Sequence, residues 1–201
     1  MSSKSKIIVL VFSLLVVCFA EHELKRLPNG FAAQVNNEKI TYVLTDYELQ
    51  DIIINGQTFK KPIIPFGGLN AEEGDPVLPT VTTFYQVAPN KSYSIEVSIQ
   101  SSEFVENIDI APHQVWDPVT TDEITLPFKR NIDLYTSDEP YPEKQASISQ
   151  TIVFRDLPVV KVSFMPFRYH PLSRQLEIIT LADIDLVETG NIEPLQIPNR
   201  R

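Results

Sequence analysis

Hydrophobic and polar residues alternate with a period of two along most of the chain. The pattern is clearest in four segments, at 40–44, 92–100, 160–164 and 176–186. Alternation of this kind is typical of half-buried antiparallel strands. The apolar positions that we expect to face a core are Ile40, Tyr42 and Leu44; Tyr93, Ile95, Val97 and Ile99; Val160, Val162 and Phe164; and Leu176, Ile178, Ile184 and Leu186, with Glu177, Asp183 and Asp185 on the polar side of the last strand.

Turn signals divide these segments, and no helical spacing extends beyond two turns. The breakers are Pro28-Asn29-Gly30, Asn55-Gly56, Gly67-Gly68, Pro89-Asn90 and Pro118. Many short strands with regular turn signals predict an all-β fold, an antiparallel, jelly-roll-like β-sandwich over residues 21–188. Residues 111–150 are less regular and contain five prolines. A long excursion of this kind inside a compact β domain is usually functional or mobile. Residues 189–201 lose the alternation and are expected to be a linker or a truncated C-terminal extension.

The N-terminus has the pattern of a secretory signal peptide. Lys4 and Lys6 precede an apolar run at 7–20, which is too short for a membrane span of about 20 residues. We expect cleavage after Ala20, with a secreted, periplasmic or cell-surface location and no membrane span in the mature chain. Cys18 offers lipidation as an alternative, but the bulky Val16-Val17 before it does not suit a lipoprotein processing site.

Net charge and cysteine content exclude several classes of function. The chain has 17 basic and 26 acidic residues, a net charge of -9, and removal of Lys4 and Lys6 with the signal changes this to -11. Such an acidic domain repels nucleic acid and anionic membranes. Cys18 is the one cysteine of the chain, so the mature domain has neither a disulfide nor a thiol nucleophile.

The mature sequence contains no recognisable set of catalytic residues, and we predict a non-enzyme without a cofactor. Its histidines are His22, His113 and His170, and no GxSxG motif supplies a nucleophilic serine. His113 and His170 each adjoin a proline-containing turn and are expected to face solvent. No HExxH, CxxC or EF-hand motif is present. Glu72, Glu73 and Asp75 around Gly74 are weak calcium candidates, and a solvated turn is the favoured interpretation.

Three short motifs occur in a fixed order. The first is Gly74-Asp75-Pro76-Val77-Leu78-Pro79, in which Gly74 is suited to positive φ and Pro79 to the start of a strand. The second is Tyr141-Pro142, and the third is Pro166-Phe167-Arg168-Tyr169-His170-Pro171 followed by Leu176. Over about residues 65 to 188 this order resembles the N-terminal propeptide of gingipain-type cysteine proteases. The chain has His170 where asparagine is common in that family.

The resemblance implies a β-sandwich that binds a gingipain-type cysteine protease domain, keeps it latent and assists its folding. Because these proteases prefer basic P1 residues, it also implies an inhibitory loop that offers Arg or Lys. The motif residues to which the resemblance gives a structural role are Gly74, Pro76, Leu78, Pro79, Tyr141, Pro142, Pro166, Tyr169 and Pro171. The candidates for the inhibitory loop are Arg130 first, then Lys129, Lys144 and Arg155. Arg155 opens a strand-like segment.

Two matters remain open at the level of sequence. The protease could follow in the same precursor, with Arg200-Arg201 as a basic processing site, or the domain could act in trans. The alternative function is a secreted adhesion or carbohydrate-binding module, for which Trp116, Tyr135 and Tyr141 would supply an aromatic platform.

Overall fold

The structure, a computed structural model, describes residues 25–26, 31–36, 39–65, 67–115, 127–193 and 195. The predicted signal peptide with Cys18 lies outside the described residues, as do His22, Trp116 and Arg200-Arg201. Among the described residues, no helix combines the length and the apolar character needed to cross a membrane.

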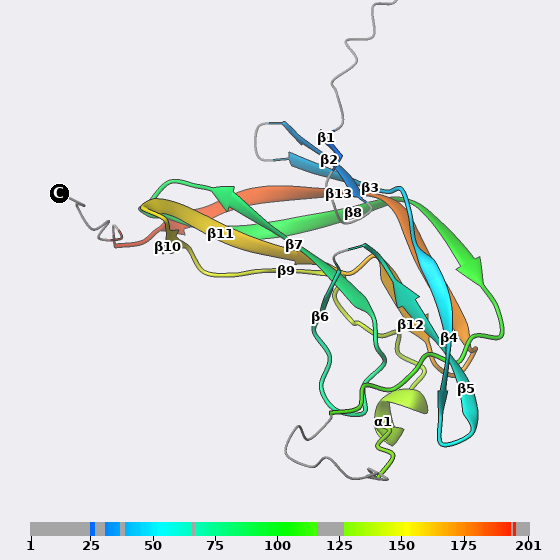
Figure 1. Cartoon of the computed structure of the whole chain (residues 1–201). Helices are drawn as coiled ribbons and strands as arrows, with labels where there is room; N and C mark the ends of the chain where they lie inside the picture. The colour runs from blue at the N-terminus through cyan, green and yellow to red at the C-terminus, as the bar shows by residue number, and fades with distance from the viewer. Residues whose placement is uncertain are drawn as a thin grey trace, which may run out of the picture.

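A first antiparallel sheet is organised around β13, which hydrogen-bonds to β3, β8 and β12. Ile184 of β13 pairs with Ile40 on one side and with Val97 on the other. Register shifts around Leu181 interrupt the ladder between β13 and β8, and both strands bend (Figure 1). Within the described residues, the strands of this sheet are β1 (Lys25–Arg26), β2 (Phe31–Asn36), β3 (Lys39–Leu44), β8 (Lys91–Val105), β12 (Phe167–His170) and β13 (Gln175–Asn191).

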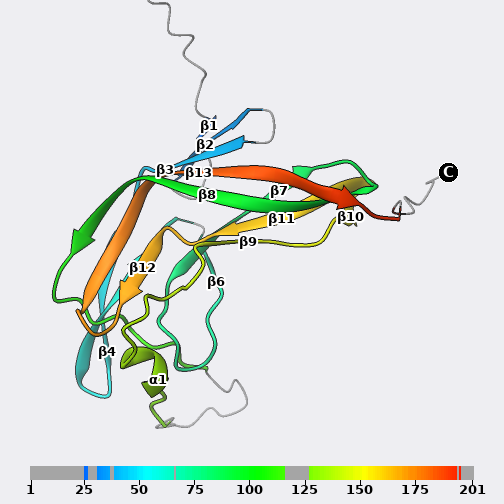
Figure 2. The ribbon, with the colours of Figure 1, turned by 180° about the vertical axis from the view of Figure 1, so that it is seen from behind.

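A second antiparallel sheet is organised around β11, which pairs with β7 on one side and with β9 and β10 on the other. The hairpin of β4 and β5 and a four-residue helix, α1, lie at one end of the molecule (Figures 1 and 2). These elements are β4 (Glu48–Ile54), β5 (Gln57–Ile63), β6 (Gly68–Leu69), β7 (Pro79–Gln86), α1 (Ile132–Tyr135), β9 (Ala146–Ile148), β10 (Ile152–Phe154) and β11 (Leu157–Phe164).

The two sheets lie face to face and enclose one hydrophobic core (Figures 1 and 2). Tyr42 of the first sheet contacts Phe164 of the second, with 5.2 Å between ring centroids. The Tyr42 and Tyr85 hydroxyls are 3.0 Å apart, so each of these two buried hydroxyls has a hydrogen-bond partner. The predicted antiparallel β-sandwich is therefore confirmed, and so is the core face of β11 at Val160, Val162 and Phe164.

On β13, the even positions Leu176, Ile178, Ile184 and Leu186 are buried as predicted. The polar side of the same strand differs from the prediction at Glu177, which is only 7% exposed. Its carboxylate lies 3.6 Å from Arg168 and 4.0 Å from His170, two residues of the neighbouring strand β12. Glu177 is buried because these long side chains cover it.

Three further expectations need correction. His170 is a half-buried strand residue beside the Phe104 ring rather than a solvent-facing turn residue. On β8, Tyr93 and Ile95 pack against the core, but Val97 and Ile99 remain 37% and 38% exposed. Arg155 does not open a strand, because it occupies the turn between β10 and β11.

The last strand also runs further than expected. β13 ends at Asn191, three residues beyond the predicted domain end at 188. The Ile192 and Leu195 amides then donate to the carbonyls of Asn90 and Pro89, at 2.9 and 3.1 Å. Part of the predicted linker is therefore bound to the turn between β7 and β8.

Asp183 of β13 should make the stability of the domain depend on pH. Burial opposes ionisation, but hydrogen bonds from Thr41 (2.6 Å) and Lys39 (3.1 Å) outweigh it, so the pKa of Asp183 lies below its usual value. A lowered folded-state pKa means that this stabilisation is present above the unfolded-state pKa of about 3.9 and is lost as pH falls through the folded-state value. Urea unfolding of the mature domain should therefore show that Asp183→Asn costs free energy of unfolding at pH 7 and much less near pH 2.

The control is Asp138→Asn, at an exposed position in the irregular middle. We expect its effect to be small at both pH values. An Asp183→Asn penalty of equal size at pH 7 and pH 2 would contradict the assignment.

Candidate functional site

The first sequence motif forms a turn that joins three separate segments. Gly74 adopts φ +94°, and its N–H donates to the carbonyl of His113 at 2.7 Å. The His113 N–H donates back to Asp75, also at 2.7 Å, and the Asn131 N–H donates to the Gly74 carbonyl at 3.0 Å. This turn therefore fixes the segments 111–113 and 130–131 against the start of β7. Gly74, Pro76, Leu78 and Pro79 are all buried.

The second and third motifs meet each other at the same end of the sandwich. The backbones of Tyr141 and Tyr169 exchange two hydrogen bonds, of 2.8 and 2.7 Å. Tyr169 is buried, and its ring packs edge-on against Tyr135 with 6.1 Å between centroids. Three motif prolines are buried beside this contact: Pro142, Pro166 and Pro171. Motifs that are far apart in sequence thus form one packed corner, which we call the motif corner.

Arg130 is built into the motif corner. Its guanidinium donates to Asp109 at 2.9 Å and lies 3.9 Å from the centroid of the Tyr135 ring. The Tyr135 hydroxyl donates to the carbonyl of Ile110 at 2.9 Å. Burial raises the pKa of the Tyr135 phenol, although the adjacent guanidinium acts in the opposite direction. With 27% of its side chain exposed, Arg130 connects three segments and still reaches the surface.

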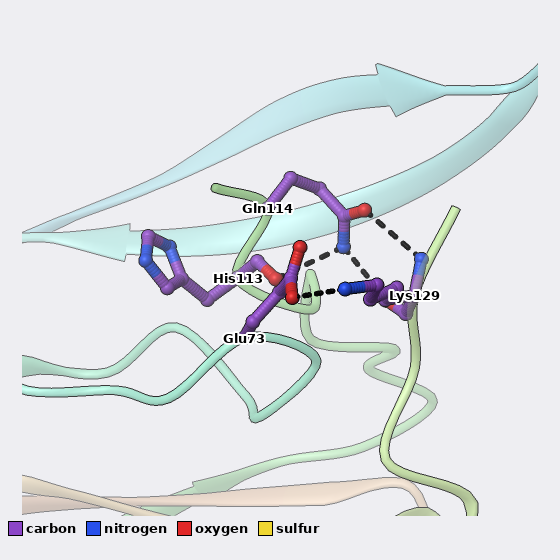
Figure 3. A network of polar contacts seen from close by, with 4 residues as sticks. All are labelled: Glu73, His113, Gln114 and Lys129. Carbon is purple, nitrogen blue, oxygen red and sulfur yellow. Dashed lines mark hydrogen bonds and ion pairs between the residues drawn. The ribbon is translucent and has the colours of Figure 1, made fainter. Parts of the chain in front are cut away.

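Lys129 is more accessible, and its backbone is held on both sides by one glutamine (Figure 3). The Gln114 amide donates to the Lys129 carbonyl at 2.7 Å and accepts from the Lys129 N–H at 3.1 Å. The Lys129 ammonium binds Glu73, and 54% of its side chain is exposed. The His113 ring points away from this network in Figure 3. The segment 129–130 therefore has a fixed backbone and two cations at the surface.

The carboxylates considered for calcium have other contacts. Glu73 binds Lys129, and Asp75 accepts a hydrogen bond of 2.8 Å from the Asn131 amide. Among the described residues, no group of three or more His, Cys, Asp or Glu side chains is arranged to hold a metal ion. Glu72, Glu73 and Asp75 thus do not form a ligand set.

The four basic loop candidates lie in different places. Lys129 and Arg130 are in the motif corner, and Lys144 is exposed two residues after Pro142. Arg155 is at the opposite end of the sandwich, in the β10–β11 turn, with α1 marking the motif corner in Figure 1. Sequence reasoning missed Asp109 and Gln114, which belong to no motif.

Tyr135 was considered only as part of an aromatic platform, but it is buried beside Arg130 and offers no exposed ring face. Trp116 of that platform is outside the described part of the chain, and Tyr141 is half-buried. What the structure does assign to Tyr135 is packing within the motif corner.

Substituting Gly74 should destabilise the motif corner specifically. A Cβ at Gly74 would lie 3.0 Å from the Asn131 nitrogen and would occupy a positive-φ position. We expect Gly74→Ala to lower the free energy of unfolding by about 2–4 kcal/mol, measured by urea denaturation.

Gly56→Ala is the matched control, because Gly56 has φ +77° but no neighbour within 4 Å of its added Cβ. It should cost only about 1 kcal/mol. Equal losses for the two variants would mean that close packing at Gly74 contributes nothing.

Comparison with known proteins identifies a family of propeptides and relatives from Porphyromonas gingivalis. The family model Propeptide_C25 matches residues 22–196. Gingipain R2 of Porphyromonas gingivalis is 25% identical over 163 residues, which cover 79% of this chain and 22% of the relative. Gingipain R1 of the same organism is 26% identical over 180 residues, covering 87% and 18%. The chain thus spans about a fifth of the length of these two curated relatives.

Two solved structures share the fold. A complex of Porphyromonas gingivalis RgpB pro- and mature domains matches with a TM-score of 0.68 and 20% identity, over 83% of this chain and 88% of that chain. A structure describing the zymogenic latency of gingipain K from Porphyromonas gingivalis matches with a TM-score of 0.63 and 17% identity, over 82% and 95%. The resemblance inferred from the three motifs is confirmed.

Proposed function

Because the chain belongs to the Propeptide_C25 family, we propose that it binds a gingipain-type cysteine protease domain, keeps it latent and assists its folding. Members of this family are propeptides rather than catalytic domains, so the chain is not itself the protease. The two solved structures associate such a domain with a mature gingipain domain and with zymogenic latency in their own proteins. We extend this association with a protease domain, and with latency, to the present chain.

The observation that carries the proposal is the clamped backbone of Lys129. A segment that enters a protease cleft binds more tightly when it is already ordered, because less conformational entropy is lost on binding. Gln114 holds both the N–H and the carbonyl of Lys129, and the Asn131 N–H is bound to Gly74. The motif corner therefore presents a basic dipeptide on a scaffold that resists rearrangement.

Arg130 is the first candidate for the residue that occupies the basic-specific pocket. In the complex its guanidinium would exchange Asp109 and the Tyr135 ring for a carboxylate of the protease, so the arginine stays paired while Asp109 loses its cation. Lys129 is the second candidate, since its exposed ion pair with Glu73 costs little to break. Lys144 and Arg155 remain further candidates because both are exposed.

Arg130→Ala should weaken inhibition of mature gingipain R2 by at least about 30-fold, because a buried charge pair in the complex would be lost. The measurement is the inhibition constant of the mature domain, residues 21–201, with an arginyl substrate. Lys129→Ala and Lys144→Ala, assayed in parallel, report on the other candidates near the motif corner.

Asp109→Asn is the control for this test. It breaks the same ion pair within the domain but leaves the guanidinium available, so it should preserve or strengthen inhibition. If Asp109→Asn weakens inhibition as much as Arg130→Ala, the arginine acts through the stability of the motif corner and not in the cleft. No inhibition by the wild-type domain would count against the proposed function itself.

The proposed partner also determines the location and the arrangement that we expect for this chain. A propeptide of a secreted or surface protease reaches that compartment with its partner, in agreement with the predicted signal peptide at 1–20. We propose latency in cis where a protease domain continues the precursor, and inhibition in trans where it is a separate chain.

A further inference from the structure

The outer face of the second sheet has an apolar patch that the core does not use. We define the outer patch as Phe84 of β7, Ile152 and Phe154 of β10, and Leu157 and Val159 of β11. In the ladder, Ile152 lies opposite Val159, and Phe154 lies opposite Leu157. Leu157 and Val159 alternate along β11 with the core residues, so these side chains are on the face of the sheet that points away from the core. Four of the five side chains, those of Phe84, Ile152, Phe154 and Leu157, are between 42% and 47% exposed.

The outer patch is a packed cluster and not a scatter of single residues. The rings of Phe84 and Phe154 stack with 5.4 Å between centroids and 10° between planes. Val159 points to the same side of the sheet, yet it is only 5% exposed and lies outside the core cluster. Its neighbours in the ladder are Ile152 of β10 and Gln86 of β7. An exposed cluster of this kind is typical of an interaction surface.

Two cations border the outer patch in a chain of net charge -9. The Arg155 guanidinium lies 5.5 Å from the centroid of the Phe154 ring, and the exposed Lys161 is directly opposite Phe84 in the ladder. A two-fold contact between copies of this chain would bring these like charges together, which disfavours self-association. The surface fits a partner with an apolar centre and carboxylates around it.

The outer patch is at the end where the described chain finishes. Leu195 donates to Pro89 in the β7–β8 turn, and Val87, just before that turn, donates to Pro158 beside the β10–β11 hairpin. The Thr151 hydroxyl donates to the Lys91 carbonyl at 3.0 Å, which ties the start of β8 to the residue before β10. In Figure 1 the end of β13 and the β10 strand lie together. A domain continuing after residue 195 would start near the outer patch, at a high effective concentration.

We propose that the outer patch is a docking surface for the mature domain of the gingipain-type protease, separate from the basic segment of the motif corner. This inference rests on the proposed function. Aromatic side chains of the outer patch increase the affinity when they lose contact with water on binding. The basic residue of the motif corner inhibits the protease by occupying its active-site cleft. This chain matches 22% of gingipain R2, so most of the length of that relative lies outside the matched part.

The test compares outer-patch variants with a matched control in binding to catalytically inactivated mature gingipain R2. Phe84→Ser combined with Phe154→Ser should raise the dissociation constant about tenfold or more, mainly through faster dissociation. Val97→Ser combined with Ile99→Ser removes similarly exposed apolar side chains from the first sheet and should leave binding within about twofold. Thermal unfolding of each variant reports on folding.

A second variant keeps the test informative if the double phenylalanine variant does not fold. Lys161→Glu changes only an exposed charge that borders the outer patch, and it should weaken binding with reduced dependence on salt. Wild-type affinity in the folded outer-patch variants, beside a working wild-type inhibitor, would overturn the inference and leave the proposed function intact. Absence of binding by the wild-type domain would overturn both.

Discussion

The turn at Gly74 is the contact on which the motif corner depends. With φ +94°, its N–H reaches the segment at His113 and its carbonyl reaches the segment at Asn131. The segment between β8 and β9 is long, and its described residues form α1 and isolated bridges rather than strands. The entropy of closing such a loop has to be offset by contacts at its base. The one cysteine of the sequence cannot form an intrachain disulfide. Backbone hydrogen bonds to a buried glycine therefore hold this base without the covalent link that a disulfide gives to many small domains.

Side chains then convert this fixed base into a defined surface. Arg130 bridges Asp109 and Tyr135, so the backbone at 130 is held from the side as well as through Asn131. Gln114 holds the backbone of Lys129 through its N–H and its carbonyl. Lys129 and Arg130 therefore have little freedom to move relative to one another. Hydrogen bonds that involve charged groups are stronger than neutral ones, and a half-buried guanidinium is less screened by solvent than an exposed one. The acidic chain thus presents its basic dipeptide at a site where surrounding carboxylates already orient it.

The sequence predicted those parts of the structure that depend on local pattern. Alternation identified the core face of β11, and the glycine before Asp75-Pro76 identified the tight turn. It did not predict the burial of Glu177, because the side chains that cover it come from β12 and depend on register. It also placed Arg155 at the start of a strand. Arg155 and Asp156 form a two-residue turn with φ +50° and +66°, the same geometry as Asn55-Gly56, but without the glycine that marks such a turn in sequence.

The apolar side chains of the outer patch are not needed for the core of the sandwich. A strand at the border of a sandwich needs apolar side chains only on its core side, and its outer side is safer when polar, since exposed edges invite aggregation. β10 has the opposite character, with Ile152 and Phe154 both on the outer side. Arg155 and Asp156 also hold positive φ without glycine, a conformation that costs about 1 kcal/mol per residue. Neither feature contributes to the core, and both agree with the proposed contact between this surface and a partner.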